Sequence, residues 1–155
     1  MELEPHVLTS LDATLDLEDG MFFASCFGTR VPEDLVAAVT VHGAATNQAT
    51  AGFASPSRSV RSMPVTVEHW DAVPRPAGDW DRTLRTQVCL DTSGELEFFS
   101  GGEVAFEFPV ARGYYELEGC SITVDGSERW RLRLWHSDQF GPDLTELDRI
   151  SRLAR

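Results

Sequence analysis

Residues 84–135 read LRTQVCLDTSGELEFFSGGEVAFEFPVARGYYELEGCSITVDGSERWRLRLW, and the alternation of apolar with polar side chains in this stretch decides the fold. Short glycine-containing segments interrupt the alternation, at 92–94, 100–102, 112–113 and 125–126. Alternation with a period of two between such turns is typical of antiparallel strands that bury one face. The stretch therefore predicts five consecutive strands.

The flanking segments extend this prediction. Apolar runs predict further strands within 1–19, 21–27 and 63–70, and residues 42–62 suit a long loop or a pair of short edge strands. The segment 31–41 is compatible with either a helix or a strand. Near the C-terminus, apolar residues recur at helical spacing after Pro142: Leu144, Leu147, Ile150 and Leu153. We predict an all-β fold, a mainly antiparallel β-sandwich, with a short C-terminal α-helix at about 143–154.

Length and composition indicate a single domain over residues 1–155, long enough to bury a core, and a hydrophobic content of 42% argues against disorder. No apolar run approaches the roughly 18 residues that span a bilayer. The acidic N-terminus does not resemble a secretory signal peptide. The three cysteines (Cys26, Cys89 and Cys120) are odd in number and widely spaced. We therefore expect a reduced, cytoplasmic protein without a membrane contact.

The chain is strongly acidic, with a formal net charge of −12. All 13 basic residues are arginine, which excludes chemistry that needs a lysine. The first 20 residues carry six acids and no base, and three of these acids follow one another closely: Asp16, Glu18 and Asp19. Such a field repels nucleic acid and favours encounter with a basic protein, although a purely solubilising surface would look the same.

Catalytic and metal-binding motifs are absent from the sequence. The four histidines (His6, His42, His69 and His136) have no metal-ligand spacing, and no nucleophile elbow or dinucleotide-binding motif occurs. Acid clusters at 12–19 and 79–81 do not match a helical calcium loop. We expect no cofactor and no metal. His69 and His136 each adjoin a tryptophan, so an alternative pocket could include His69, Tyr114 and His136.

Two patterns concern possible surfaces. Arg129, Arg131 and Arg133 share one face of a predicted strand, opposite Trp130, Leu132 and Leu134, which we expect to be buried. The arginines could pair with Glu116 and Glu118, or with Glu95 and Glu97, or form an anion- or partner-binding stripe. Trp80, in the polar loop 78–81, and Trp135, on the arginine face, are the candidate exposed anchors for a partner.

The order of features from residue 51 onward resembles the competence protein J family, small bacterial proteins that inhibit a DNA-entry nuclease. The resemblance lies in Ala51–Ala54, the strand from Val88 to Phe98, the corner Phe108–Tyr115 and the closing strand Arg129–Trp135. It implies a β-sandwich without catalytic residues. The chain departs from the family in the loop 74–81 and in having no lysine.

The leading hypothesis is a non-enzymatic acidic protein that occludes a basic partner, a nuclease or a toxin. Asp16, Glu18, Asp19, Trp80 and Trp135 are its candidate binding residues. The alternative is a small β-barrel or sandwich enzyme, of the cyclase or isomerase type, with a pocket for a hydrophobic small molecule. A structural interaction subunit is a third possibility.

Overall fold

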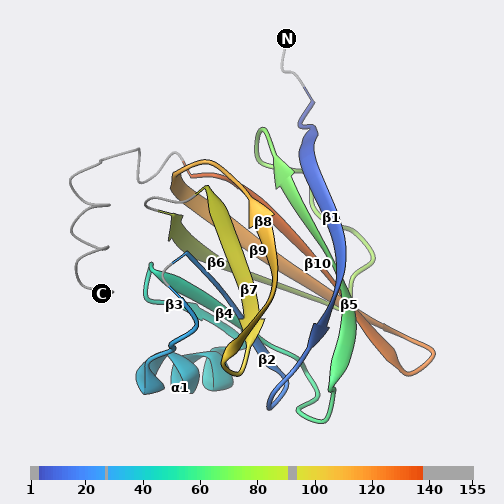
Figure 1. Cartoon of the computed structure of the whole chain (residues 1–155). Coiled ribbons are helices and arrows are strands. Elements are labelled where there is room, and N and C mark those ends of the chain that lie inside the picture. The colour runs from blue at the N-terminus through green and yellow to red at the C-terminus, as the bar shows by residue number, and fades with distance from the viewer. Residues whose placement is uncertain (1–3, 27, 91–93, 138–155) are drawn as a thin grey trace.

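The computed structural model describes residues 4–26, 28–90 and 94–137. This part of the chain is mostly β-strand and contains one helix (Figure 1). The elements in chain order are β1 (Val7–Asp16), β2 (Met21–Ser25), α1 (Glu33–His42), β3 (Ala44–Thr46), β4 (Thr50–Ala54), β5 (Ser62–Trp70), β6 (Arg82–Leu90), β7 (Glu95–Ser100), β8 (Glu103–Pro109), β9 (Gly113–Val124) and β10 (Ser127–His136). The all-β prediction and the five strands expected within 84–135 are confirmed.

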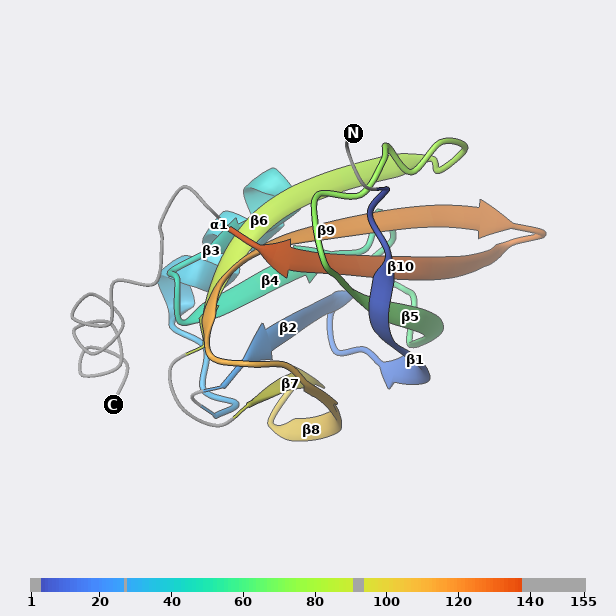
Figure 2. The ribbon, with the colours of Figure 1, turned by 90° about the horizontal axis from the view of Figure 1, so that it is seen from above.

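The strands form two five-stranded sheets. Sheet A has the order β1-β5-β10-β9-β6, and sheet B has the order β3-β4-β2-β7-β8. All neighbours are antiparallel except β5 and β10, which run parallel with Val65 opposite Trp130. Viewed from above, the β9–β10 hairpin extends beyond the other strands (Figure 2). The sheets therefore combine hairpins such as β7–β8 and β9–β10 with pairs of strands that are distant in the chain, one of which, β5–β10, is parallel.

One hydrophobic core takes side chains from both sheets. Trp130 of sheet A is 1% exposed and meets Phe22 of sheet B edge to face, with ring centroids 5.1 Å apart. Leu132 and Leu134 are fully buried on the same face of β10. The prediction that Trp130, Leu132 and Leu134 face the core is confirmed.

The single described helix settles the question left open for 31–41. Pro32 precedes the helix, the acids Glu33 and Asp34 occupy its first turn, and Leu35 and Val39, four residues apart, are buried on one face. These two residues pack against Phe23 and Phe99 of sheet B. Acids in a first turn stabilise a helix through its dipole. The segment left open is therefore a helix, α1. The C-terminal helix expected at 143–154 falls outside the described residues.

Gly43 ends the helix in the left-handed conformation, with φ of 82°, and its N–H donates to the Val39 carbonyl. A side chain at this position would collide with the guanidinium of Arg82. That guanidinium donates to the Ala54 carbonyl at 2.8 Å and so ties the start of β6 to the end of β4.

The cysteines Cys26, Cys89 and Cys120 are not joined by disulfide bonds. Among the described residues no helix is long and apolar enough to cross a bilayer.

Candidate protein-binding surface

Several turns meet at one end of the molecule, the lower end in Figure 1. The β1–β2 turn is bonded to the segment after β4, because Ser55 N–H donates to the Gly20 carbonyl and Leu17 N–H donates to the Arg61 carbonyl, both at 2.7 Å. On the other edge of sheet A, Thr123 N–H donates to Asp81 Oδ2 at 2.9 Å. We call this region the hairpin end; it comprises residues 16–20, 55–62, 78–81, 100–103 and 123–128.

The three acids predicted as binding residues all lie at the hairpin end and are exposed: Asp16, Glu18 and Asp19. The turn that carries them is held rigidly, since Glu18 N–H donates to Ser100 Oγ at 2.7 Å and this hydroxyl donates to the Met21 carbonyl at 2.6 Å. Asp19 adopts a positive φ of 55° within this turn. The acids are therefore presented by a fixed loop.

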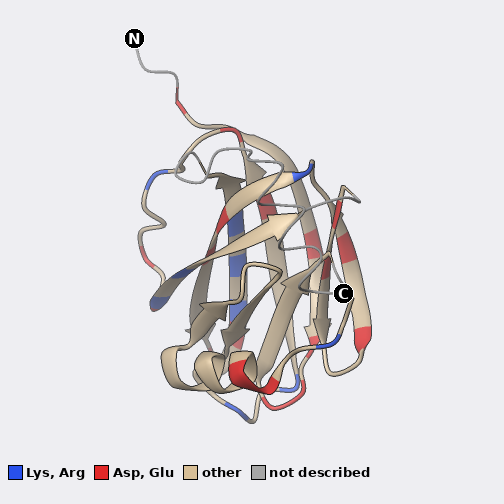
Figure 3. Ribbon diagram, turned by 90° about the vertical axis from the view of Figure 1, so that its left-hand side faces the viewer, with Lys and Arg blue, Asp and Glu red and all other residues tan. Residues whose placement is uncertain are grey.

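Further exposed acids lie at the same end. Asp81, Glu103 and Asp125 are exposed in or beside the turns, and Glu33 and Asp34 add two more at the start of α1 (Figure 3). Glu103 and Asp125 were not singled out from the sequence. The sequence feature that could have identified both residues is the adjacent glycine-containing turn, because side chains in such turns point to solvent.

Of the two predicted anchors, only Trp80 lies at this end. Trp80 is half-buried in the loop before β6, one residue from Asp81. Sheet order places it near the opposite edge from the β1–β2 turn, because β6 and β1 are the two edges of sheet A. Trp135 is 3% exposed and lies beneath the Arg85 guanidinium, 5.0 Å from the ring centroid. Its expected exposure is therefore wrong: the side chain is buried, and Arg85 of β6, two strands away in sheet A, lies over its ring.

The outer face of the β7–β8 hairpin carries a second set of acids. Glu97 and Glu107 stand directly opposite each other in the register. The hydrogen bond between Glu95 and Glu107 and the charge of Glu107 raise the pKa of Glu95, and burial and the charge of Glu97 raise it further. The expectation that Glu95 and Glu97 could face the arginines of β10 is wrong, because they lie in sheet B whereas β10 lies in sheet A.

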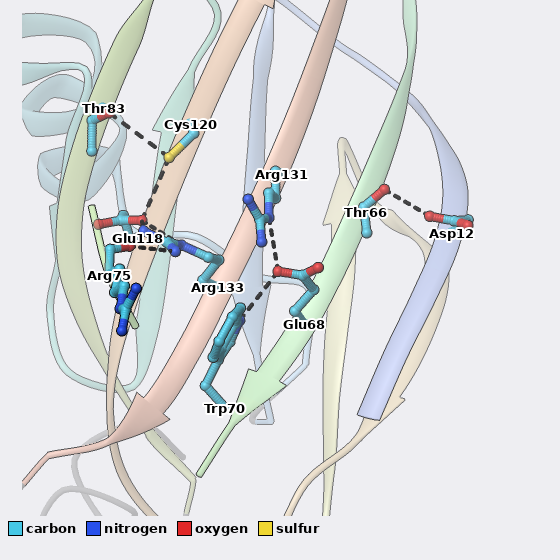
Figure 4. Close-up of polar contacts among 10 residues, drawn as sticks. All are labelled: Asp12, Thr66, Glu68, Trp70, Arg75, Thr83, Glu118, Cys120, Arg131 and Arg133. Atoms are coloured by element: carbon cyan, nitrogen blue, oxygen red, sulfur yellow. Dashed lines mark hydrogen bonds and ion pairs between the residues drawn. The ribbon is translucent and has the colours of Figure 1, made fainter. Parts of the chain in front are cut away.

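The outer face of sheet A carries paired charges (Figure 4). The Arg133 and Glu118 side chains are 3% and 6% exposed, and Arg133 Nε donates to Glu118 Oε1 at 2.7 Å. Arg85 approaches the same carboxylate at 3.5 Å. Arg131 Nε donates to Glu68 Oε1 at 2.8 Å. The expected cross-strand pairing with Glu118 is confirmed, and Glu68, on the parallel neighbour β5, is the partner that sequence reasoning missed.

Cys120 lies within this polar face, with its thiol 3.5 Å from Glu118 Oε1. Burial raises the pKa of the Cys120 thiol, with a further contribution from the Glu118 charge. A thiol held in its neutral form is a poor nucleophile. Cys120 therefore acts here as a packing residue.

The alternative pocket residues lie at the opposite end of the strands and are only partly together. The ring of Tyr115 separates His69 from His136, with centroids 5.7 and 5.5 Å away. Tyr114 points to the other face of β9 and packs with Ala49 and Cys89. The nearest described hollow to this end, about 270 Å³, is lined in part by Trp70, Arg131 and Arg133. These arginines already form ion pairs or hydrogen bonds, so the hollow has a polar rather than a hydrophobic lining.

His69 should make stability depend on pH. Burial, and then the charge of His136, lower the pKa of His69 from its ordinary value of 6.5. The unfolded chain therefore takes up this proton at a higher pH than the folded protein does, so the stability is complete above about pH 6.5 and falls as the pH drops toward the lowered folded-state pKa. Thermal melts between about pH 7.5 and pH 5.5 should show a smaller decrease in Tm for His69→Gln than for the wild type.

The exposed His42 provides the control for this prediction. His42→Gln should keep the wild-type decrease in Tm. An equal decrease in all three proteins would contradict the assignment to His69.

Comparisons with known proteins add one finding to this geometry. No family model matches the sequence, and no curated protein sequence matches it. The structure is similar to the crystal structure of ComJ, inhibitor of the DNA degrading activity of NucA, from Bacillus subtilis, with a TM-score of 0.66 and 8% sequence identity. The match covers 87% of this chain and 100% of that chain. The chain thus shares the fold of ComJ over that protein's full length.

Proposed function

We propose that the protein is a non-enzymatic inhibitor that works in the cytoplasm by occluding a basic protein partner, a nuclease or a toxin. The observation that carries this proposal is the similarity of fold to ComJ, which extends over all of the ComJ chain. We also infer that the two sheets pack face to face as a β-sandwich, in support of which Phe22 and Trp130 from opposite sheets meet in one core.

The distribution of charge supports a basic partner. An enzyme that degrades DNA binds a polyanion, so its substrate cleft carries positive charge. The exposed acids of the hairpin end (Asp16, Glu18, Asp19, Asp81, Glu103 and Asp125) offer carboxylates to such a cleft. By contrast, the charges of sheet A are largely neutralised by one another. We therefore propose the hairpin end as the surface that binds the partner, with Trp80 at its border.

Inhibition can be tested directly. Fractions of the native host's extract that degrade DNA should include one whose activity is lost when the purified protein is added in equimolar amount. The inhibited nuclease should then co-elute with the protein in gel filtration. If every DNA-degrading fraction kept its activity, or if the purified protein alone converted a small molecule, the inhibitor proposal would be wrong.

Binding kinetics should show electrostatic steering by the hairpin end. The screening length shrinks from about 30 Å at 0.01 M salt to about 8 Å at 0.15 M, so the association rate should fall steeply over this range. The triple variant Asp16→Asn/Glu18→Gln/Asp19→Asn should associate more slowly than the wild type.

Trp80→Ala should mainly raise the dissociation rate, because a desolvated aromatic anchor acts on dissociation.

The outer face of sheet B offers a matched control. Glu95→Gln/Glu97→Gln/Glu107→Gln changes the net charge by the same three units at a different place. Surface plasmon resonance should give a smaller loss of association rate for this control than for the hairpin-end triple variant. Equal losses would show that only the net charge matters and that the binding surface is not at the hairpin end.

A further inference from the structure

A buried carboxylate at the hairpin end has no charged partner in the part of the chain that the structure describes. The Glu128 residue is 7% exposed, although it lies near the tip of the projecting β9–β10 hairpin. Its hydrogen-bond partner among the described residues is Ser55, whose Oγ lies 2.8 Å from Oε1 and 2.7 Å from Oε2. A hydroxyl carries one proton, whereas a carboxylate can accept about four hydrogen bonds. Most of the accepting capacity of Glu128 is therefore unused.

The carboxylate is held in place by its surroundings. Ser57 N–H donates to the Ser55 hydroxyl at 3.0 Å, so this hydroxyl is oriented toward Glu128. Ser55 N–H is in turn bonded to the Gly20 carbonyl in the turn that carries the acids. A buried charge is costly unless an opposite charge or several hydrogen bonds compensate for it. The arrangement fits a site whose counter-charge comes from another molecule.

Glu128 lines a pocket of about 470 Å³ between the segment after β4 and the β9–β10 hairpin. This volume lies in the range of ligand pockets, roughly 300–1,000 Å³. The remaining lining residues are mostly small or polar: Pro56, Ser57, Ser59, Val60, Arg61, Ser62, Pro64, Thr123, Gly126 and Ser127. Arg61 is exposed and forms no ion pair with Glu128 in the structure. The pocket thus combines room for a side chain with one fixed negative charge and several hydroxyl acceptors.

We propose that this pocket receives the guanidinium or ammonium group of an arginine or lysine side chain from the protein partner, with Glu128 as its counter-ion. This inference rests on the proposed function, which supplies the basic partner. A cation could donate to the carboxylate and to the serine hydroxyls, and charge-assisted hydrogen bonds of this kind are the strong ones. A single carboxylate does not suit a metal ion, which needs several such ligands.

The charge requirement can be tested with a matched pair of small probes. N-acetyl-arginine methylamide carries the guanidinium, and the citrulline analogue has nearly the same shape without the charge. In NMR titrations, the arginine probe should shift the amide signals of Ser57 and Ser127 with saturation, and the citrulline probe should bind about tenfold more weakly or not at all. Equal binding of the two probes would overturn the proposal.

Variants test the role of Glu128. Glu128→Gln keeps the shape and the Ser55 contact, and it should weaken the arginine probe about tenfold. Asp125→Asn is the control, because Asp125 is exposed in the adjacent turn with φ of 52°, a conformation that asparagine tolerates. Arg61→Gln should tighten binding slightly by removing a like charge. If only Arg61→Gln bound the probe, Arg61 itself would be the natural occupant and the proposal would be wrong.

The same variants separate this inference from the proposed function. Full nuclease inhibition by Glu128→Gln, with wild-type affinity, would refute the pocket and leave the inhibitor function standing. Saturable binding of the arginine probe in a protein that inhibits no nuclease would leave the cation pocket standing and refute the inhibitor function. A drop in affinity for the nuclease in Glu128→Gln, but not in Glu107→Gln on the outer face of sheet B, would support both and would identify the partner's side chain as the source of the cation.

Discussion

Replacing Arg133 by methionine should lower the free energy of unfolding by about 3–5 kcal/mol, because it leaves the Glu118 carboxylate buried without its main partner. Arg133 binds this carboxylate through Nε and Nη2, at 2.7 and 2.5 Å, and donates from Nη1 to the Arg75 carbonyl at 2.8 Å. Of the two described arginines that pair with Glu118, the more exposed Arg85, at 3.5 Å, would remain. Urea denaturation followed by circular dichroism measures the loss.

Two variants make this first prediction specific. Arg133→Met/Glu118→Leu removes both charges and should recover most of the stability, since replacing a buried ion pair by apolar side chains is often neutral. Arg129→Met changes an exposed arginine of the same strand and should cost less than about 1 kcal/mol. If Arg133→Met cost no more than Arg129→Met, the pair would not contribute to stability.

Truncating Trp130 to alanine should cost about 3–5 kcal/mol, the range for large aromatic side chains in a core. The Trp130 ring packs edge to face against both Phe22 and Phe53, with centroids 5.1 and 5.7 Å away, while these two rings stack on each other. Gly119 of the neighbouring strand β9 faces the same ring, and a Cβ there would lie 2.8 Å from it. At this position β9 therefore has no side chain that could fill the cavity left by the truncation. Denaturant unfolding of Trp130→Ala measures the effect.

Trp130→Phe provides the comparison. The Trp130 Nε1 atom is buried and has no hydrogen-bond partner among the described residues, so phenylalanine loses volume without losing a hydrogen bond. We expect its loss of stability to be well under half of that of Trp130→Ala. Similar losses in the two variants would indicate that the N–H group contributes after all.

The sequence predicted the strands and their faces well because alternation is a local property. In β10 it separated Trp130, Leu132 and Leu134 from the arginines correctly. It could not identify which strands are neighbours, because pairing depends on contacts between distant segments. Glu68, which binds Arg131 from 63 residues away, was missed for this reason. Glu95 and Glu97 were considered as acids on a strand that could neighbour β10, yet they belong to the other sheet.

The candidate site was predictable in part. Acids in the β1–β2 turn were identified from charge alone, because turns expose their side chains. Glu128 was not identified, although a signal exists: it shares the register of Trp130, Leu132 and Leu134, where a core-facing side chain is expected. A charged residue at a position where the alternation predicts a core-facing apolar side chain therefore indicates a candidate site, as a motif does. The buried Trp135 contacts Arg85 of another strand, and local patterning does not reveal such a contact.

The parallel pairing of β5 with β10 has a consequence for how the protein is made. The residues that pair, such as Val65 and Trp130, are 65 positions apart in the chain, and β10 is also the link between β5 and β9. During synthesis, β1 and β5 can form only a two-stranded unit until β10 emerges, and an isolated pair of strands is marginally stable. Contacts of such long range also slow folding. A nascent chain arrested before residue 127 would leave the edge of β5 that pairs with β10 without its partner strand, so sheet A is completed only once β10 has been synthesised.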